Sequence, residues 1–485
     1  MQDRTDPIIA ISTAPGKGAV GIVRISGHSL EGFTEILTKT KLEEKKVRFI
    51  KLKDTQGELI DEVLCIFFKG PNSYTGEDIL EIQGHGGPIV LQRIVKHCLK
   101  ISKLRDTATQ AEQLPYLRIA RPGEYSERAF LNNKIDLLQA EAIIDLIDAS
   151  TEQASLGASR SLSGEFSKNI KDLLSEITQT RVFIEAHIDF PEEEIGALEI
   201  QRIKEKLTKE IDISNKLLAR TKNGLLLKEG INTVITGQPN AGKSSIMNAL
   251  CQQDVSIVTD IEGTTRDLVR QHMQVDGIPI NLIDTAGINF EKKDKIDPVE
   301  KIGIEKAWKE LHTAELVIFV HDISRVFEKT YIETSLQILK EIERGQNKNT
   351  KLIHILNKSD LINENKDLEL AKTYFDKLFQ VNTLILSTKS SGELQKLRER
   401  ILNDMGWSKD NSENVHLARS RHLQSIIKVK EHLEVAVSLF DSKILSLELI
   451  AEEMRLVQNA LSEITGEYSS DDLLGEIFST FCIGK

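Results

Sequence analysis

Short apolar runs separated by turn-forming residues dominate the start of the chain. The runs cover residues 8–11, 20–25, 47–52, 64–68 and 79–82, and glycine-rich turns lie at 15–18 and 84–87. Runs of this length, bounded by glycine and proline, are typical of β-strands. Residues 1–130 are therefore predicted to form a small α+β domain, in which the polar stretch 104–116 is an exposed loop.

A helical period replaces these runs from residue 131 onward, where Leu137, Ile144 and Ile147 fall on one helix face. After residue 407 the three-and-four spacing returns, and only Lys443 interrupts it. Such a seam suits the core of a helix bundle or a coiled pairing of helices, and a bundle core is the simpler interpretation. We predict an all-α domain built from residues 131–229 and 408–485, with residues 230–407 inserted between them. The seam consists of Ile426, Val429, Leu433, Ala436, Phe440, Leu447, Ile450, Met454, Val457, Leu461 and Ile464.

Residues 237–244 match the phosphate-binding loop pattern of two glycines followed by lysine and serine. An apolar run at 234–236 precedes the loop and a helix-like stretch at 245–250 follows it, which is the context that the motif requires. Glycines let backbone N–H groups turn toward phosphate oxygens, and the helix N-terminus adds a favourable dipole. Lys243 can then reach the β- and γ-phosphates, and Ser244 can bind Mg²⁺. Alone, the pattern also fits an ordinary glycine turn before a helix.

Three further segments decide between these interpretations: Asp-Thr-Ala-Gly at 284–287, Asn-Lys-Ser-Asp at 357–360 and Ser-Thr-Lys at 387–389. Asp284 is expected to hold the same Mg²⁺ through water. The carboxylate of Asp360 can accept hydrogen bonds from N1–H and the exocyclic amine of guanine. Adenine lacks this donor pair and would leave the carboxylate unpaired, so ATP is disfavoured. The four segments together predict a GTPase.

A further segment, Gly-Thr-Thr-Arg-Asp at 263–267, follows the loop where a switch I threonine is expected, and Thr265 is the candidate for contact with Mg²⁺ and the γ-phosphate. Ile288 occupies the position where Ras-type enzymes have the glutamine that orients water, and an apolar side chain cannot do this. The side-chain carbonyl of Asn240 could coordinate a monovalent cation that replaces an arginine finger. It could equally stabilise the turn of the loop, and the residues leave both interpretations open.

The chain has 485 residues, which corresponds to about three domains at ~150 residues each. Its 63 lysines and arginines against 74 aspartates and glutamates give a net charge of −11. Nucleic-acid binding by overall charge is therefore not expected, and RNA contact needs a local basic patch or a partner's surface. The four cysteines show no metal-ligand spacing, which fits a reducing cytosol. Without a signal sequence or a long apolar run, the chain is predicted to be soluble and cytoplasmic.

The last five residues are Phe-Cys-Ile-Gly-Lys, and Cys482 invites a comparison with prenylation motifs. Gly484 and Lys485 fit such a motif poorly, so lipidation is not expected. A thiol at a fixed end of a domain is more often buried than catalytic. Cys482 is therefore a candidate functional thiol without an assigned role.

These terminal residues, the segment Arg-Pro-Gly-Glu-Tyr-Ser-Glu-Arg-Ala-Phe at 121–130 and the loop containing Asn240 together resemble the MnmE (TrmE) family of tRNA-modification GTPases. The likeness runs nearly end to end. It implies a folate-binding and dimerisation domain over 1–130, an all-α domain over 131–229 and 408–485, and a Ras-like P-loop α/β G domain over 230–407. It also implies a homodimer whose G domains pair across their switch regions in a potassium-dependent way.

The resemblance further implies a function. Family members place an aminomethyl-type (carboxymethylaminomethyl) group on C5 of the wobble uridine of certain tRNAs. They act with the flavin-dependent partner MnmG (GidA), in a heterotetramer or larger assembly. The one-carbon unit comes from a tetrahydrofolate derivative, either the 5,10-methylene or the 5-formyl form.

Residue roles follow from the same resemblance. The implied folate ligands are Arg24, Glu81, Lys134 and the terminal Lys485. The implied potassium ligands are Asn240, Thr259, Ile261 and Thr264, and the implied Mg²⁺ ligands are Ser244 and Thr265. Glu300 would orient the attacking water and act in catalysis with Lys243 and Thr265, although a solvated carboxylate at a helix start is its plain alternative. The full predicted GTP-binding set is Asn240, Ala241, Gly242, Lys243, Ser244, Ser245, Thr259, Asp260, Ile261, Glu262, Gly263, Thr264, Thr265, Asp284, Thr285, Ala286, Gly287, Asn357, Lys358, Asp360, Ser387, Thr388 and Lys389.

Two departures from the family pattern concern the rim of the folate pocket and the alignment of Glu300. Residues 107–114 resemble an insertion beside the first domain, and residues 291–297 are lysine-rich and irregular before Glu300. Two other functions compete with tRNA modification. One is a GTPase switch for ribosome assembly, and the other is a folate-binding scaffold with a decayed GTPase. The nucleotide-site residues are intact, which argues against the scaffold: Lys243, Ser244, Thr265 and Asp284.

Overall fold

In a computed structural model of the chain, the described residues are 5–105, 110–189, 196–252, 270–284, 308–347, 350–362, 364–407, 415–441, 446–466, 477, 479–481 and 484. They divide into two compact units. The first contains Met1–Ile144, Gly164–Ser175 and Gln458–Lys485, and the second contains Asp145–Ser163 and Glu176–Val457. The division of the chain into four domain segments stays a prediction.

A six-stranded mixed sheet with strand order β3-β4-β5-β2-β1-β6 organises the first unit. Neighbouring strands are antiparallel except β1 and β6, which are parallel. Apolar residues of α1 and α2, such as Phe33 and Ile94, pack on the sheet in one core with Val23 and Ile82. The elements are β1 (Ile8–Ile11), β2 (Val20–Gly27), α1 (Glu31–Thr38), β3 (Arg48–Lys53), β4 (Leu59–Phe68), β5 (Asp78–His85), α2 (Pro88–Ser102), β6 (Arg118–Ile119) and α3 (Glu124–Leu131).

The predicted strands of this sheet are present, but two details of the prediction were wrong. β4 begins at Leu59 instead of residue 64, because its first half pairs with β3, and the buried carboxylate of Asp61 binds the His85 ring at 2.7 Å. The polar residues Asp61 and Glu62 interrupt the apolar run, so the sequence did not indicate the first half of this strand. The loop at 104–116 is not exposed throughout, since Leu114 is 6% exposed and belongs to the core.

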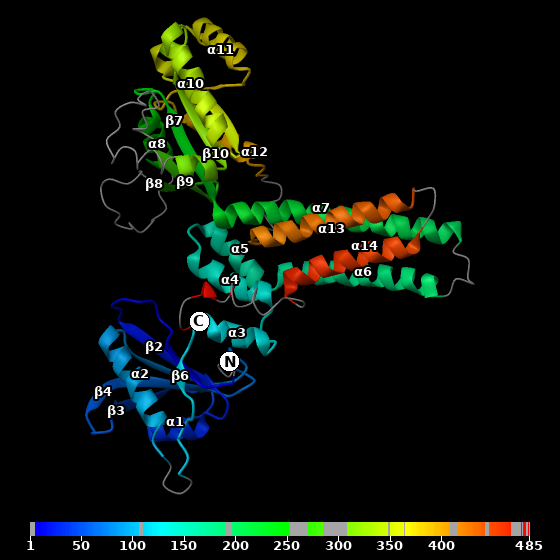
Figure 1. Cartoon of the computed structure of the whole chain (residues 1–485). Helices are drawn as coiled ribbons and strands as arrows, with labels where there is room; N and C mark the ends of the chain where they lie inside the picture. Colours follow the sequence, from blue (N-terminus) through cyan, green and yellow to red (C-terminus); the bar gives the residue numbers. More distant parts are fainter. Residues whose placement is uncertain are drawn as a thin grey trace. The chain divides into compact units, whose positions relative to one another are not determined.

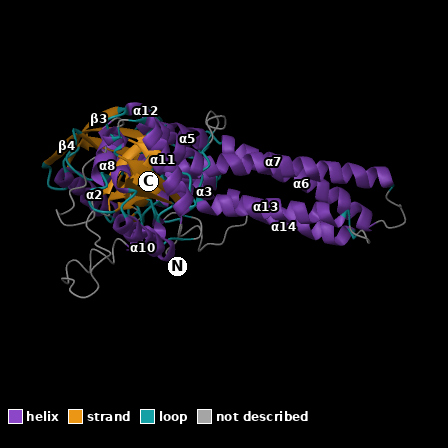
Figure 2. Ribbon diagram, turned by 90° about the horizontal axis from the view of Figure 1, so that it is seen from above, coloured by secondary structure: helices purple, strands orange, loops and turns teal. Residues whose placement is uncertain are grey.

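Long helices from both flanks of the inserted domain form an all-α part, as the apolar period predicts. In both views α6 (Glu165–Asp189), α7 (Ala197–Glu229), α13 (Ser420–Leu439) and α14 (Leu447–Thr465) run side by side (Figures 1 and 2). Seam residues such as Ile426, Leu433 and Met454 are fully buried, which identifies the seam as bundle core. The shorter helices α4 (Leu137–Asp148) and α5 (Glu152–Leu162) precede α6.

The second sheet lies in the inserted segment and has the order β12-β11-β10-β7-β9-β8. All neighbouring strands are parallel except β8 and β9. Parallel strands joined by helices bring their carboxyl ends, and the loops that follow them, to one edge. The elements are β7 (Ile231–Gly237), α8 (Lys243–Gln252), β8 (Arg270–Val275), β9 (Ile278–Asp284), β10 (Leu316–Asp322), α10 (Lys329–Gly345), β11 (Lys351–Asn357), α11 (Asn365–Phe379), β12 (Leu384–Leu386) and α12 (Ser391–Asp404).

Short 3₁₀ turns follow two of these strands, at η1 (Ile323–Arg325) after β10 and at η2 (Ser359–Leu361) after β11. The predicted fold class is confirmed: an α+β first domain, an all-α part from both flanks and an inserted α/β domain. Among the described helices, none is long and apolar enough to cross a membrane.

Candidate functional site

The predicted phosphate loop connects β7 to α8 and packs closely against two neighbours. Gly237 has φ +147°, and a Cβ there would lie 2.3 Å from the carbonyl oxygen of Val320. Gly242 has φ +97°, and a Cβ there would lie 2.1 Å from Nδ2 of Asn357. Both positions therefore require glycine for conformation and for space.

The side chains of Asn357 and Lys243 fix this loop by hydrogen bonds to its carbonyl groups. The amide of Asn357, which is 2% exposed, donates to the carbonyl of Ala241 at 2.9 Å. The ammonium of Lys243 donates to the carbonyls of Gly237 and Gln238 at 2.9 and 3.1 Å. The loop thus forms a cradle in which Lys243 is already held at its centre, at the start of α8.

The base-recognition segment follows β11 at the same edge of the sheet. Ser387, which follows β12, donates its hydroxyl to one carboxylate oxygen of Asp360 at 2.8 Å, and Lys389 donates to the other at 2.5 Å. The hydrogen bond and the charge of Lys389, together with the Ser387 hydroxyl, lower the pKa of Asp360. An ionised carboxylate with spare lone pairs suits the two N–H donors of guanine.

A polar network that the sequence did not reveal joins these two parts of the site. Lys358 donates to Asp322 at 2.6 Å, and the backbone N–H of Asp322 donates to the hydroxyl of Tyr331 at 2.7 Å. The carbonyl of Tyr331 accepts from the side-chain amide of Gln238 at 2.6 Å, and Ser335 accepts from the same amide at 2.7 Å. The signal available in the sequence was the position of Asp322 directly after the apolar run 316–320 and His321.

The loop residues predicted to hold cations present their side chains to solvent. Asn240 is exposed and has φ +62°, a left-handed conformation that asparagine tolerates well. Ser244 is exposed in the first turn of α8. Hydroxyl and amide oxygens are suitable ligands for Mg²⁺ and K⁺, so these two residues fit their predicted roles.

A second group of predicted ligands lies on the sheet of the first unit. Arg24 on β2 is directly opposite Glu81 on β5, and its Nε and Nη2 donate to one carboxylate oxygen at 3.0 and 2.7 Å. The guanidinium carbon lies 5.8 Å from the ring centroid of Tyr74 and 5.7 Å from that of Tyr125. The hydroxyl of Tyr125 donates to the carbonyl of Arg24 at 2.7 Å, so this side chain also fixes the strand.

Another predicted folate ligand, Lys134, belongs to the same unit. Lys134 donates to the carbonyl of Pro71 at 2.9 Å. Gly484 has φ +98°, and a Cβ there would lie 2.3 Å from the carbonyl oxygen of Ile11 at the end of β1. Because β1 pairs with β2 alongside Arg24, the last described residue lies beside the strands that hold this group.

A buried charge network underlies this surface and was also not predicted. Arg128, which is 4% exposed, binds Glu77 at 2.9 Å and Glu124 at 3.0 Å, and donates to the carbonyl of Asp6 at 2.6 Å. Burial would raise the pKa of Glu124, but hydrogen bonds from Arg118, the Arg121 backbone and Arg128 outweigh it and lower the pKa to about 2. The network ties α3 to the sheet.

Comparisons with known proteins cover nearly the whole chain. A model of the MnmE helical domain matches residues 137–482, and a model of the GTP-binding protein TrmE N-terminus matches residues 7–134. The tRNA modification GTPase MnmE of Polaromonas naphthalenivorans (strain CJ2) is 44% identical over 487 residues, which cover 99% of this chain and 98% of that protein. The chain belongs to the MnmE family.

Other relatives agree with this assignment to the MnmE family of tRNA modification GTPases. The MnmE protein of Paracidovorax citrulli (strain AAC00-1) is 45% identical over 482 residues, which cover 99% of both chains. A solved structure of an Era variant from Aquifex aeolicus bound to GDP·AlF4⁻ is 23% identical and covers 41% of this chain and 65% of its own. Its TM-score of 0.29 is too low to support an argument.

Several residues with predicted roles in this MnmE-family chain lie outside the described part of the structure. They are Thr259, Asp260, Ile261, Glu262, Gly263, Thr264, Thr265, Thr285, Ala286, Gly287, Glu300, Cys482 and Lys485. Asp284 is described only in its backbone, as the last residue of β9, next to β7 in the sheet. Their assigned roles stay predictions. Among the described residues, no group of three or more histidines, cysteines or carboxylates could hold a metal ion.

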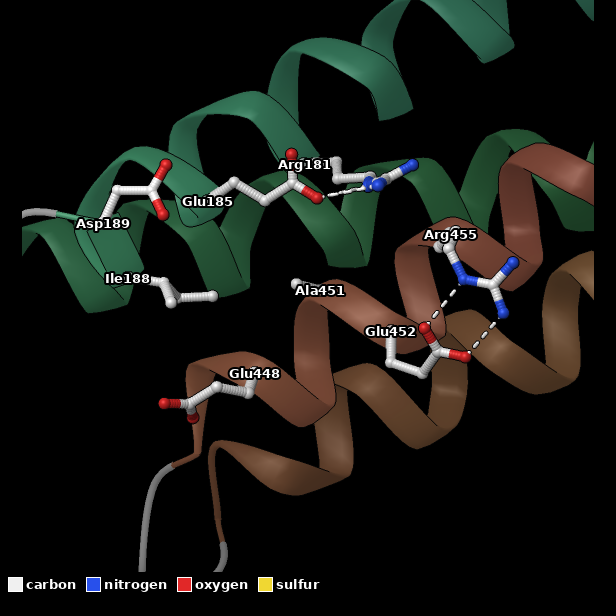
Figure 3. A pocket seen from close by; sticks show the side chains of 8 residues that line it. All are labelled: Arg181, Glu185, Ile188, Asp189, Glu448, Ala451, Glu452 and Arg455. Carbon is white, nitrogen blue, oxygen red and sulfur yellow. Dashed lines mark hydrogen bonds and ion pairs between the residues drawn. The ribbon is translucent and has the colours of Figure 1, made fainter.

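An open groove of about 330 Å³ lies between α6 and α14 of the MnmE-family bundle. Figure 3 shows Arg181 paired with Glu185 and Arg455 paired with Glu452, each within its own helix, while Asp189 and Glu448 project nearby. Four carboxylate side chains line the groove, and both guanidinium groups already bind carboxylates, so the groove does not resemble an anion-binding site. We assign it no role in the reaction.

Proposed function

We propose that this chain is a potassium-dependent GTPase that modifies C5 of the wobble uridine in certain tRNAs with an aminomethyl-type group. The single observation that supports this best is that three of the four guanine-nucleotide segments, at 237–244, 357–360 and 387–389, are joined by hydrogen bonds at one sheet edge in a chain of the MnmE family. We further propose that it acts as a homodimer, in the cytoplasm, with the flavin-dependent protein MnmG in a heterotetramer or larger assembly. Family membership favours this function over a ribosome-assembly switch.

The proposed nucleotide chemistry combines residues of the described site with predicted residues that lie outside the described part of the structure. Asp360 selects guanine, the loop amides and Lys243 bind the phosphates, and Ser244 and Thr265 hold Mg²⁺. Asn240, with oxygens of Thr259, Ile261 and Thr264, holds K⁺, which supplies positive charge where an arginine finger would act. Glu300 orients the attacking water. Hydrolysis then lets paired G domains separate, and the helical part transmits that motion.

A tetrahydrofolate derivative fits the predicted folate ligands on chemical grounds, and it would supply the one-carbon unit. Arg24, Lys134 and Lys485 are cations that suit its carboxylates, and Glu81 can accept hydrogen bonds from pterin N–H groups. The half-buried ring of Tyr74 adds flat apolar surface beside Arg24.

The proposal is tested by measuring GTP hydrolysis by the purified protein in matched potassium and sodium buffers. Severalfold faster turnover in potassium supports the cation assignment, and equal rates would contradict it. Binding of 5-formyltetrahydrofolate to the same wild-type preparation is compared with its binding to the Arg24→Ala variant. Loss of binding in the variant, with unchanged GTP hydrolysis, supports the folate site.

A further inference from the structure

The turn that follows β11 is fixed by an ion pair to the neighbouring strand. Asp322 and Asn357 are the last residues of β10 and β11 and are partners in the parallel register. Lys358, the next residue, reaches sideways, and its Nζ lies 2.6 Å from Oδ2 of Asp322. The pair therefore joins two adjacent strand ends at the edge where the nucleotide segments gather.

The backbone at Lys358 needs such a restraint. Lys358 has φ 67° and ψ 38°, a left-handed conformation that is unfavourable for a residue with a long side chain. This conformation turns the chain from β11 into η2, which contains Asp360. A bond that holds the lysine side chain against β10 favours the turned backbone over an extended one.

The two carboxylate oxygens of Asp322 have different hydrogen-bond partners. Oδ1 accepts from the backbone N–H of Ser324 at 3.0 Å and from its hydroxyl at 2.6 Å, which caps η1. Oδ2 binds Lys358. Burial would raise the pKa of Asp322, but the bonds from Lys358 and Ser324 lower it, so the group is a carboxylate at neutral pH.

Asp360, in the turn that follows β11, is consequently held by residues from the strands on both sides of β11. Ser387 and Lys389 restrain its carboxylate from the β12 side, and the pair between Lys358 and Asp322 restrains its backbone from the β10 side. Strand β11 lies between these two neighbours in the sheet. A shift of the turn would move the carboxylate out of line with two donors on a flat base.

We propose that Asp322 is a positioning residue for guanine recognition, which acts through Lys358 to place Asp360 in line with the base. This inference rests on the guanine-nucleotide site proposed above and names a determinant of its specificity. Asp322 is 5% exposed, and we do not expect it to contact the nucleotide. Its contribution is therefore expected in affinity and in base discrimination, and not in the chemical step.

The chain offers sharply matched variants for the test. Asp322→Asn keeps an oxygen that caps η1 but removes the charge that binds Lys358. Ser324→Ala removes the hydroxyl bond to Oδ1 and leaves Oδ2 paired. Glu341→Gln breaks an exposed ion pair with Arg344 on α10, outside the network, and controls for loss of charge. Asp322→Ser, which also caps without charge, replaces Asp322→Asn if that variant does not fold.

Three quantities are measured for each variant of the whole chain. They are the affinity for GTP, the affinity for inosine triphosphate (ITP), which lacks the exocyclic amine, and the rate of hydrolysis at saturating GTP. Asp322→Asn should bind GTP about tenfold more weakly, because a charge-assisted hydrogen bond is lost. It should lose severalfold of the GTP-over-ITP preference and keep its turnover at saturation. Ser324→Ala and Glu341→Gln should match the wild type in preference.

A double variant separates positioning from general damage. In a Lys358→Met background, Asp322→Asn should change GTP affinity less than twofold, because its effect passes through the lysine. An Asp322→Asn protein with wild-type affinity and preference overturns the inference, and so does full additivity in the double variant. A wild-type protein that does not bind GTP instead contradicts the nucleotide site itself.

Discussion

Two histidines on adjacent strands of the second sheet form a fully buried pair, and their burial predicts acid sensitivity. His321 and His354 lie 0% and 3% exposed, with Nε2 of the first 3.2 Å from Nδ1 of the second. The rings of Phe319, Phe375 and Phe379 surround His321, with centroids 4.1, 4.6 and 5.7 Å away. Neither imidazole can be protonated there without desolvating a charge.

The size of the effect follows from the pKa difference between the folded and unfolded chain. Burial lowers the pKa of His354 to about 4, against an opposing effect of Asp376, while an unfolded histidine titrates near 6.5. Burial and the neighbouring imidazole also lower the pKa of His321. Because the unfolded chain binds more protons, stability is present above about pH 6.5 and is lost as the pH falls toward 4. At about pH 5, His354 alone should cost ~2 kcal/mol.

The assay is urea unfolding followed by tryptophan fluorescence at about pH 7.5 and about pH 5. The chain has 2 tryptophans, Trp308 and Trp407, and both pack against apolar clusters of the second sheet, so the signal reports this domain. The control is His321→Leu/His354→Leu, which replaces both partners with apolar groups and should be tolerated. On going from the higher to the lower pH, the free energy of unfolding of the wild type should fall by at least ~2 kcal/mol more than that of the control. Equal losses in both proteins would refute the reasoning.

Three further predictions concern other parts of the molecule. Gly242→Ala should abolish GTP binding while leaving the fold intact, because its Cβ would lie 2.1 Å from the Asn357 amide, and normal binding in a calorimeter would contradict the close approach. Arg128→Met should lower the free energy of unfolding of the first domain by about 3–5 kcal/mol, since Glu77 would be left buried without its guanidinium partner, while Glu124 would keep Arg118; a thermal midpoint equal to wild type would show that the network is dispensable. Glu300→Ala should bind GTP normally but hydrolyse it far more slowly, and unchanged turnover would mean that another group orients the water.

Local patterns in the sequence predicted the parts of the fold that depend on neighbouring residues. The loop at 237–244 and its flanking strand and helix are contiguous, so glycine spacing and apolar runs were sufficient. The buried seam from Ile426 onward follows from helical period alone. The sequence therefore indicated the fold class.

Contacts between distant residues were not predictable in this way. Asp322 meets Lys358, and Gln238 meets Tyr331, only because parallel strands and α10 bring them together. The sequence around Glu210 did not indicate that this residue is buried either. It is 1% exposed on α7, where burial raises its pKa to about 7 and Thr180 donates to it at 2.9 Å. A charged residue within a polar-rich helix resembles a solvated one until the packing is known.

The central proposal is that this MnmE-family GTPase modifies wobble uridine and needs GTP to do so. The most direct measurement is a mass-spectrometric nucleoside profile of bulk tRNA from cells that lack the protein, complemented by wild type or by Lys243→Ala. We predict loss of the C5-aminomethyl-type uridines, restored by wild type and not by Lys243→Ala. An unchanged profile in the deletion strain would contradict the tRNA substrate, and full restoration by Lys243→Ala would contradict the need for GTP.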